Sequence, residues 1–359
     1  MRTVSAIKNI NSTLIVYGFN MVLQFIIRFV LLYYLSIEYL GLNGLFDNIL
    51  TVLSLTELGI GPAIIFSLYS PLANHDLETA KSIMRIFKKA YIYIGTLILF
   101  LGLCISPFVQ HLIKVPPNIA YLNIFFLLFV VDTGISYFYS YKKCLLIADQ
   151  KQYIANYYRG ITQLIGSLFQ IALVILTHSF WVYIILRICM TFSENFLIAR
   201  KADHLYSFLN EKNIQPLNKD IYQNIIRNIK ALILHKIGGV TVFGTSNIIL
   251  SKFVGLSAVA LYTNYYLIIN GIDKLSDQVF NALKASVGNL NESHDDAHKL
   301  VIFKRLEFMT AYLACFICSN LYLLLNPFIT IWLGNSYRFD ESIVLWMVIN
   351  FYLMFMRKG

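Results

Sequence analysis

The feature that most constrains this chain is a series of long apolar segments separated by short polar connections. About 20 apolar residues in an α-helix span the hydrocarbon core of a bilayer. Hydrophobic residues make up 58% of the 359 residues and charged residues 13%, whereas soluble domains average about 25% charged residues. The sequence therefore predicts an all-α polytopic membrane protein. Ten spans are expected, at residues 12–35, 41–69, 90–113, 119–140, 157–177, 180–199, 231–254, 256–283, 307–333 and 342–356.

The positions of the basic residues predict the orientation of these spans. If the N-terminus is cytoplasmic, 22 of the 29 Lys and Arg residues fall on the cytoplasmic side, 3 on the outer side and 4 within spans. Lys and Arg are enriched in cytoplasmic loops, so both termini are expected to be cytoplasmic. The net charge of +10 is then a consequence of topology, and no nucleic-acid partner is expected.

A polar stripe runs along the second expected span, residues 41–69. Its members follow one another in steps of three or four, which places them on one face of a helix. Charge that faces lipid is costly, so such a stripe turns toward protein or water. The alternative is that Asp47 lies near a membrane surface and Glu57 is a paired structural acid. The stripe consists of Asn43, Asp47, Thr51, Ser54, Glu57 and Gly61.

Two further spans carry polar stripes. Shifting the sequence by 219 residues aligns spans one and two with spans seven and eight, which indicates a weak parallel repeat. Striped helices at equivalent positions predict an aqueous cavity between two halves, with helix-to-helix contacts as the alternative. The stripe in span one is Thr13, Tyr17, Asn20, Gln24 and Arg28, and that in span eight is Thr263, Tyr266, Asn270, Asp273, Asp277, Asn281 and Lys284, with Lys274 beside it.

Individual charges within the spans have open alternatives. Arg28 either binds an anion or pairs with Asp47 or Glu57. Arg187 either faces the cavity or extends toward the membrane surface. Lys274 binds an anion or is neutralised by its acidic neighbours. Asp132 has no basic neighbour in its own span and is a candidate for proton exchange.

The cysteines give no sign of a metal or redox site. Cys315 and Cys318 form a CxxC pair, but within an apolar run and without His or further Cys nearby, unlike a zinc site. We therefore expect no metal, cofactor or catalytic residue.

The segment from Arg28 to Ala73 carries the runs YLGLNGLF and LSLTELGIG. It resembles the N-terminal signature of Wzx-type polysaccharide repeat-unit flippases, members of the multidrug/oligosaccharidyl-lipid/polysaccharide (MOP) exporter superfamily. The resemblance implies two lobes in a V-shaped, MATE-like architecture with a cationic cavity. It implies flipping of undecaprenyl-pyrophosphate-linked oligosaccharide across the bacterial cytoplasmic membrane, for capsule or exopolysaccharide, with ion-coupled alternating access in some members. Relatives have 12 or 14 spans, so this chain is expected to be truncated at its C-terminus.

On this basis the chain is expected to comprise a six-helix lobe at 1–200, a cytoplasmic loop at 201–230 and an incomplete four-helix lobe at 231–359. Expected partners are the lipid-linked oligosaccharide, membrane lipid and other polysaccharide-assembly membrane proteins. Expected substrate-binding residues are Arg28, Arg187 and Lys274 for pyrophosphate and Asn20, Gln24, Tyr266 and Asn270 for sugar, and expected ion-coupling residues are Glu57, Asp132, Asp273 and Asp277.

Three alternatives remain open. A cation-coupled multidrug exporter of the same superfamily should have an acidic cavity. An integral-membrane enzyme should carry carboxylates or Arg clusters in a large outer loop, which the short outer connections disfavour. An inactive truncated relic would explain the missing spans.

Overall fold

The structure is a computed structural model that describes residues 2–57, 59–117, 119–211, 215–293 and 296–358. Within these ranges the secondary structure consists of α-helices and short 3₁₀ helices, without strands. The chain divides into two compact units, a first unit of residues Met1–Ala260 and a second unit of residues Leu261–Gly359. The prediction of an all-α chain is confirmed.

Most of the helices have the length and composition of membrane spans. Seven helical segments of the described chain are long and apolar enough to cross a bilayer, and a bent pair makes an eighth. Only 17–39% of the residues in the apolar windows of the seven are buried within the protein, which leaves most of each helix surface for contact with lipid. The two other expected spans also lie in helices. They are 256–283, which carries the polar stripe, and 342–356, which forms a shorter apolar helix.

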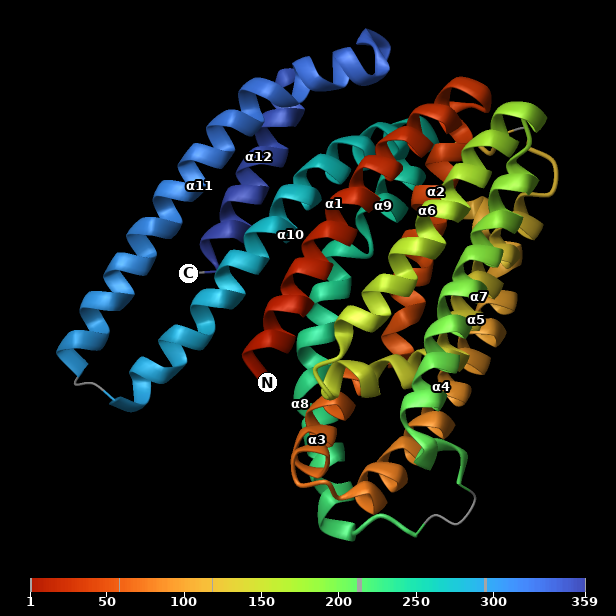
Figure 1. The fold of residues 1–359 in the computed structure, drawn as a ribbon. Helices are drawn as coiled ribbons and strands as arrows, with labels where there is room; N and C mark the ends of the chain where they lie inside the picture. The colour runs from red at the N-terminus through yellow and green to blue at the C-terminus, as the bar shows by residue number, and fades with distance from the viewer. Residues whose placement is uncertain (1, 58, 118, 212–214, 294–295, 359) are drawn as a thin grey trace. The chain divides into compact units, whose positions relative to one another are not determined.

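The first unit is built from nine helices of the described chain and the start of a tenth (Figure 1). Three 3₁₀ segments join some of them: η1 (Ser54–Glu57), η2 (Ser106–Leu112) and η3 (Ser207–Asn210). The α-helices are α1 (Arg2–Tyr34), α2 (Ile37–Leu53), α3 (Ile60–Ala73), α4 (Leu77–Ile105), α5 (Leu122–Ala148), α6 (Gln152–Thr177), α7 (Phe180–Leu205), α8 (Lys219–Phe243), α9 (Ser246–Phe253) and the beginning of α10 (Leu256–Ser293).

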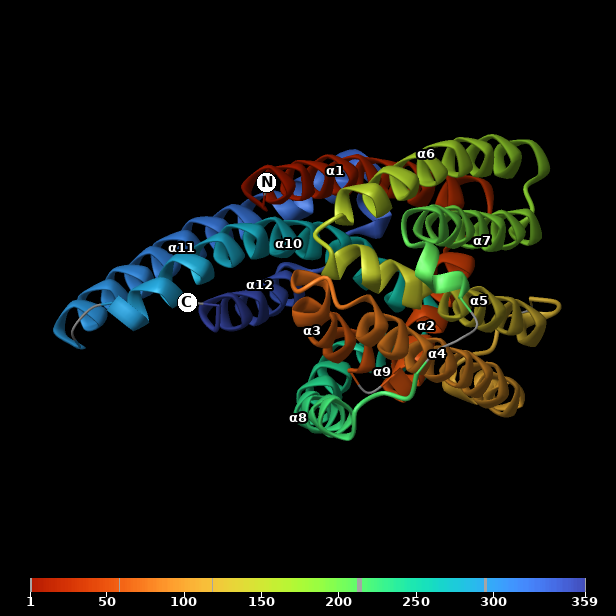
Figure 2. The same cartoon turned by 60° about the horizontal axis from the view of Figure 1, so that its bottom comes forward.

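Helices α6, α7, α5 and α4 lie side by side in that order, and α1 packs along α6 (Figure 2). Small residues permit these close contacts, as is common between membrane helices. A Cβ on Gly102 of α4 would lie 2.3 Å from a methyl group of Val130 in α5. A Cβ on Gly166 of α6 would lie 2.3 Å from Met190 in α7. The α4–α5 and α6–α7 pairs therefore depend on glycine at these positions.

The second expected span, 41–69, is a broken helix. Helix α2 ends at Leu53, η1 follows, and α3 leaves at 46°. Gly59 lies at the break with a φ of 74°, a left-handed conformation that glycine adopts without steric cost. The prediction of one continuous α-helix under this stripe is therefore wrong: the α-helix ends at Leu53, Ser54 and Glu57 lie in η1, and Gly61 lies beyond the bend.

Helices α8 and α9 pack with the first unit rather than away from it. Helix α8 contacts α2 and α3, and α9 lies against α2. Asn247 of α9 donates its side-chain amide to the Gly44 carbonyl oxygen at 3.0 Å, and its backbone N–H bonds to Asn48 Oδ1 at 2.9 Å. The expected lobe boundary at 201–230 stays a prediction, although these contacts group 219–253 with the preceding helices.

The second unit consists of the rest of α10 with α11 (Asp296–Leu333), η4 (Asn335–Tyr337) and α12 (Glu341–Met356). Helices α11 and α12 pack along each other, and Tyr265 of α10 is fully buried in their shared core. The Tyr265 hydroxyl donates to Asn326 Oδ1 and accepts the Phe339 backbone N–H at 3.0 Å. The Tyr265 hydroxyl, the Asn326 amide oxygen and the Phe339 backbone N–H thus all have hydrogen-bond partners inside an apolar core.

Candidate functional site

A polar cavity of about 360 Å³ lies inside the first unit, between α1, α2, α5, α6 and α7. Side chains that form hydrogen bonds or carry charge outnumber apolar ones in its lining. Such an interior is costly in a membrane protein unless it serves a polar ligand or ions. The polar and charged lining residues are Asn20, Gln24, Arg28, Asn43, Asp47, Asp132, Gln163, Ser167, Gln170, Tyr183, Arg187, Thr191 and Glu194.

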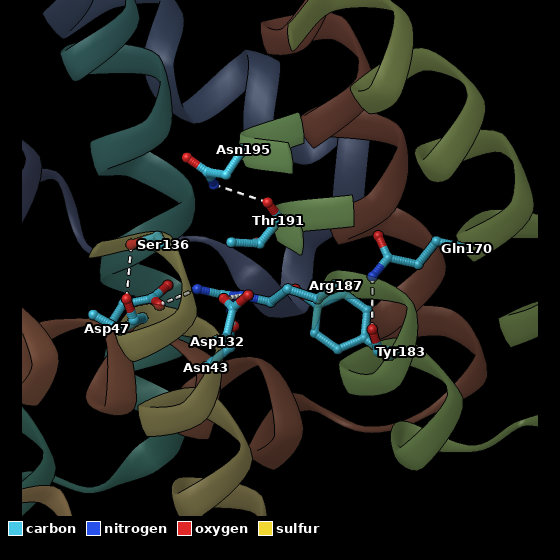
Figure 3. Close-up of polar contacts among 10 residues, drawn as sticks. Asn43, Asp47, Asp132, Ser136, Gln170, Tyr183, Arg187, Thr191 and Asn195 are labelled. Carbon is cyan, nitrogen blue, oxygen red and sulfur yellow. Dashed lines mark hydrogen bonds and ion pairs between the residues drawn. The ribbon is translucent and has the colours of Figure 1, made fainter. Parts of the chain in front are cut away.

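The Arg187 guanidinium is the centre of the charged end of this cavity (Figure 3). Its Nε donates to Asp132 Oδ2 at 2.9 Å, and its Nη2 donates to Asp47 Oδ1 at 2.8 Å. Its Nη1 donates to Asn43 Oδ1 at 3.0 Å, and its Cζ lies 4.4 Å from the Phe129 ring centroid. One arginine thus connects α7 to α5 and to α2, because its planar fork presents five donors.

Asp132 is the most deeply buried acid at this site, with its side chain 7% exposed. A buried carboxylate needs a close counter-charge, because desolvation of an ion is expensive. Arg187, 55 residues later in the chain, supplies that charge. Asp132 has no basic neighbour in its own span, and its basic partner comes from α7 instead. Its other oxygen, Oδ1, is buried and has no hydrogen-bond partner within the described residues. This oxygen can therefore accept a further hydrogen bond.

Helix α1 contributes three polar residues to the cavity lining, Asn20, Gln24 and Arg28, each one turn from the next. Arg28 interacts electrostatically with Asp47 and Tyr183, and Asp47 also forms an ion pair with Arg187. The buried Asn20 Oδ1 has no hydrogen-bond partner within the described chain. Of the sequence-based candidates, Asn20, Gln24, Arg28, Arg187 and Asp132 thus line one cavity.

A second charged group, Glu194, lies in the same lining and was missed by the sequence analysis. Gln163 Nε2 donates to Glu194 at 3.3 Å, and Lys143 and Arg159 approach it at 3.9 Å. Polar residues recur in steps of three or four on α6 (Asn156, Arg159, Gln163, Ser167, Gln170) and on α7 (Tyr183, Arg187, Thr191, Glu194). The same periodicity that identified the α1 stripe would have identified both of these.

Glu57 lies apart from this cavity, in a cluster at the α2–α3 break. The Tyr91 hydroxyl donates to its Oε1 at 3.2 Å, and the Tyr137 hydroxyl donates to its Oε2 at 3.4 Å. Lys236 of α8 pairs with the same carboxylate at 3.5 Å. Gly61 leaves room for this group, because a Cβ there would lie 2.9 Å from both Glu57 and the Tyr91 hydroxyl. Glu57 is therefore not brought together with Asp132 or Arg28.

The α10 candidates belong to the second unit, where Lys358 pairs with two of them. Its ammonium group lies 2.7 Å from both Asp273 and Asp277. The sequence left open whether Lys274 binds an anion or is neutralised by these two acids, and it gave no sign of this contact from the C-terminal end of the chain. Tyr266 stacks on Tyr262 with ring centroids 5.8 Å apart. Asn270 and Lys274 lie on the same helix, and whether any of these residues contacts substrate stays a prediction.

Comparison with known proteins supports the architecture. No protein-family model and no curated protein matches the chain. The chain is similar to a solved structure described as the inward-facing conformation of a multidrug resistance MATE family transporter of the MOP superfamily. The alignment covers 96% of this chain and 80% of the chain of the solved structure, with a TM-score of 0.66 and 13% sequence identity. The chain has the fold of a MATE transporter. Together with the apolar helices, this likeness makes it a multi-pass membrane protein. The similar structure is a transporter rather than an enzyme, and at this identity the likeness concerns the fold alone.

Proposed function

We propose that the protein is a membrane transporter that flips an undecaprenyl-pyrophosphate-linked oligosaccharide across the bacterial cytoplasmic membrane, with both termini in the cytoplasm. The observation that carries this proposal is the lining of the first-unit cavity. Its side-chain amides, from Asn20, Gln24, Asn43, Gln163 and Gln170, both donate and accept hydrogen bonds. This matches the alternating donors and acceptors of sugar hydroxyls, whereas sites for apolar ligands are mostly apolar.

In this proposal the two arginines of the cavity have different roles. Arg187 already bonds to two carboxylates and an amide, so it mainly holds α2, α5 and α7 in register. Arg28 is the cation that meets the pyrophosphate, with Gln24 one turn and Asn20 two turns away on the same helix. A bidentate guanidinium contact suits a phosphate group. The polyprenyl tail remains in lipid while the head group crosses.

Thermodynamic linkage between proton binding and head-group binding restricts which carboxylates can couple an ion to the flipping of the substrate. If protonation of Asp47 or Asp132 weakens their hold on Arg187, an anionic head group and a proton favour each other's binding at this site. Outward transport of the anionic head group in exchange for an inward-moving proton therefore requires carboxylates outside this cavity. Glu57 at the α2–α3 break and the Asp273–Asp277 pair satisfy that requirement because they lie outside the cavity lining.

The second candidate function is a cation-coupled multidrug exporter. The cavity lining contains three carboxylates, from Asp47, Asp132 and Glu194, against two guanidinium groups. An acidic lining favours organic cations, and competition between a cation and a proton for the same carboxylate produces exchange. The similar solved structure, a multidrug resistance transporter, agrees equally well with this candidate.

Reconstitution of the full chain into proteoliposomes separates the two candidates. A fluorescent undecaprenyl-pyrophosphate oligosaccharide reports flipping, and ethidium reports cation export driven by a pH gradient. We expect flipping by the wild type, a loss of at least tenfold in Arg28→Gln, and unchanged activity in Arg227→Gln, which removes an exposed arginine of α8. Ethidium export without lipid flipping, abolished by Asp47→Asn, would establish the second candidate instead. Failure of both assays with a folded protein would contradict the transporter proposal.

A further inference from the structure

A second cavity, of about 520 Å³, lies in the first unit where α4 begins and η3 follows α7. It shares no lining residue with the polar cavity described above. Its walls combine two kinds of residue. Basic side chains come from the first four turns of α4, and apolar and aromatic ones come from α4, α5 and η3. The lining residues are Lys81, Met84, Arg85, Lys88, Lys89, Ile92, Tyr141, Phe208, Leu209 and Glu211.

Three of these basic residues have charges that no carboxylate neutralises. Arg85, Lys88 and Lys89 are exposed and make no ion pair within the described residues. Their spacing of three and four residues places them on one face of α4. Surface cations are usually scattered or paired with acids nearby, so an unpaired triad beside a cavity indicates attraction for an anion.

The walls of the cavity are fixed by contacts of Lys81 and Ser82, which do not involve Arg85, Lys88 or Lys89. Lys81 is buried and bonds to Glu78 at 2.8 Å and to Glu211 at 2.7 Å. Ser82 donates to the Gln215 carbonyl oxygen at 2.8 Å. These contacts fix the chain after α7 against α4, and that chain carries Phe208 and Leu209, which form a wall of the cavity. The site is therefore preformed from two segments 130 residues apart.

The apolar walls identify the kind of anion. Ile92 follows Lys88 and Lys89 by one turn, is 42% exposed, and precedes Tyr93, which is 70% exposed. Helix α4 thus passes from a basic to an apolar exposed surface at this point. A soluble phosphate would bind only the cations, whereas a lipid phosphate would also cover the apolar wall with its acyl or prenyl chain. Basic pockets beside membrane helices recognise lipid head groups in this way.

We propose that this cavity binds the phosphate head group of an anionic membrane lipid, through Arg85, Lys88 and Lys89. The tail of the lipid lies along α4 beyond Ile92. Two sources share this chemistry, a phospholipid such as phosphatidylglycerol and a polyprenyl phosphate. Because the two cavities share no residue, this site does not depend on the transport activity proposed above.

Native mass spectrometry of the purified full chain tests the proposal. The probes are phosphatidylglycerol, undecaprenyl phosphate, zwitterionic phosphatidylcholine and inorganic pyrophosphate, each added separately. The test variant is Arg85→Gln/Lys88→Gln/Lys89→Gln. Its control removes one Arg and two Lys from exposed positions of α8, as Arg227→Gln/Lys219→Gln/Lys230→Gln. A charge-conserving Lys88→Arg variant and the melting temperature of each protein check that the fold is retained.

Each basic residue near an anionic lipid contributes roughly a fivefold factor in affinity, so loss of three predicts about a hundredfold weaker binding. We expect that loss for at least one of the two anionic lipids in the test variant, little change in the α8 control, and retention in Lys88→Arg. Preference for phosphatidylglycerol or for undecaprenyl phosphate identifies the source. Equal binding of phosphatidylcholine, equal binding of pyrophosphate, or equal losses in the test and control variants would overturn the proposal.

Discussion

Replacement of Arg187 by methionine removes a cation that forms an ion pair with Asp132 in the first unit. The Asp132 side chain is 7% exposed and Arg187 is 27% exposed, whereas Asp47 is 43% exposed. The cost therefore comes mainly from Asp132, since Asp47 can be hydrated. Removing one partner of a buried ion pair destabilises a protein by about 3–5 kcal/mol, because a buried charge is left uncompensated. We expect a loss of that size in the free energy of unfolding, measured by SDS titration of the purified protein.

The double variant Arg187→Met/Asp132→Leu tests the reason for this loss. Replacing a buried pair with apolar residues is often close to neutral, so most of the lost stability should return. The control is Arg338→Met, which breaks an exposed pair with Glu341, where the side chains are 43% and 72% exposed. Such pairs contribute about 0–1 kcal/mol. A cost below 1 kcal/mol for Arg187→Met, or no recovery in the double variant, would refute the reasoning.

Three further predictions concern packing, capping and charge. Gly41→Ala places a Cβ 2.3 Å from the Leu256 carbonyl oxygen and should lower the free energy of unfolding by about 1–3 kcal/mol. Gly18→Ala, with open space around it, should leave that free energy unchanged or raise it by about 0.5–1 kcal/mol. Equal effects of the two substitutions in SDS titration would contradict this prediction. Asp76 caps α4 by accepting the Thr79 N–H at 3.0 Å, so Asp76→Ala should cost about 1 kcal/mol at neutral pH. Hydrogen bonding from the Thr79 side chain and backbone lowers the Asp76 pKa, so the difference between wild type and variant should vanish as the pH falls through that lowered pKa; a pH-independent difference would count against the cap. Lys358→Ala removes the ion pairs of the C-terminal end of the chain with Asp273 and Asp277. It should therefore increase amide hydrogen exchange in the last turn of α12. Unchanged exchange would show that these ion pairs are not formed in solution.

Periodicity in the sequence predicted those parts of the fold and site that depend on one helix. The apolar runs gave the helical class and, within several residues, most spans. The spacing of Asn20, Gln24 and Arg28 placed all three on a common face, and they line one cavity. Steps of three and four residues determine a helix face wherever the helix continues, and α1 is continuous over this stretch.

Contacts between helices distant in sequence were not predictable from periodicity. Asp132 was identified as a candidate for proton exchange because its own span has no basic residue, and its ion-pair partner Arg187 lies on α7. Glu57 was placed on the Asp47 face because one continuous α-helix was assumed, whereas α2 ends at Leu53 and Glu57 lies in the 3₁₀ segment η1. Pairing across helices depends on packing geometry, and a single sequence does not specify that geometry.

The central claim is that the first-unit cavity is a water-accessible site for a polar head group. Cysteine labelling tests it most directly, in a background where Cys104, Cys144, Cys189, Cys315 and Cys318 are replaced by alanine. Gln163→Cys reports the cavity lining, and Phe169→Cys reports the outward face of the same helix, where Phe169 is 60% exposed. We predict that a membrane-impermeant thiol reagent labels Gln163→Cys but not Phe169→Cys, and that a lipid-linked oligosaccharide protects Gln163→Cys. Absence of labelling at position 163, or equal labelling of both positions, would contradict the account.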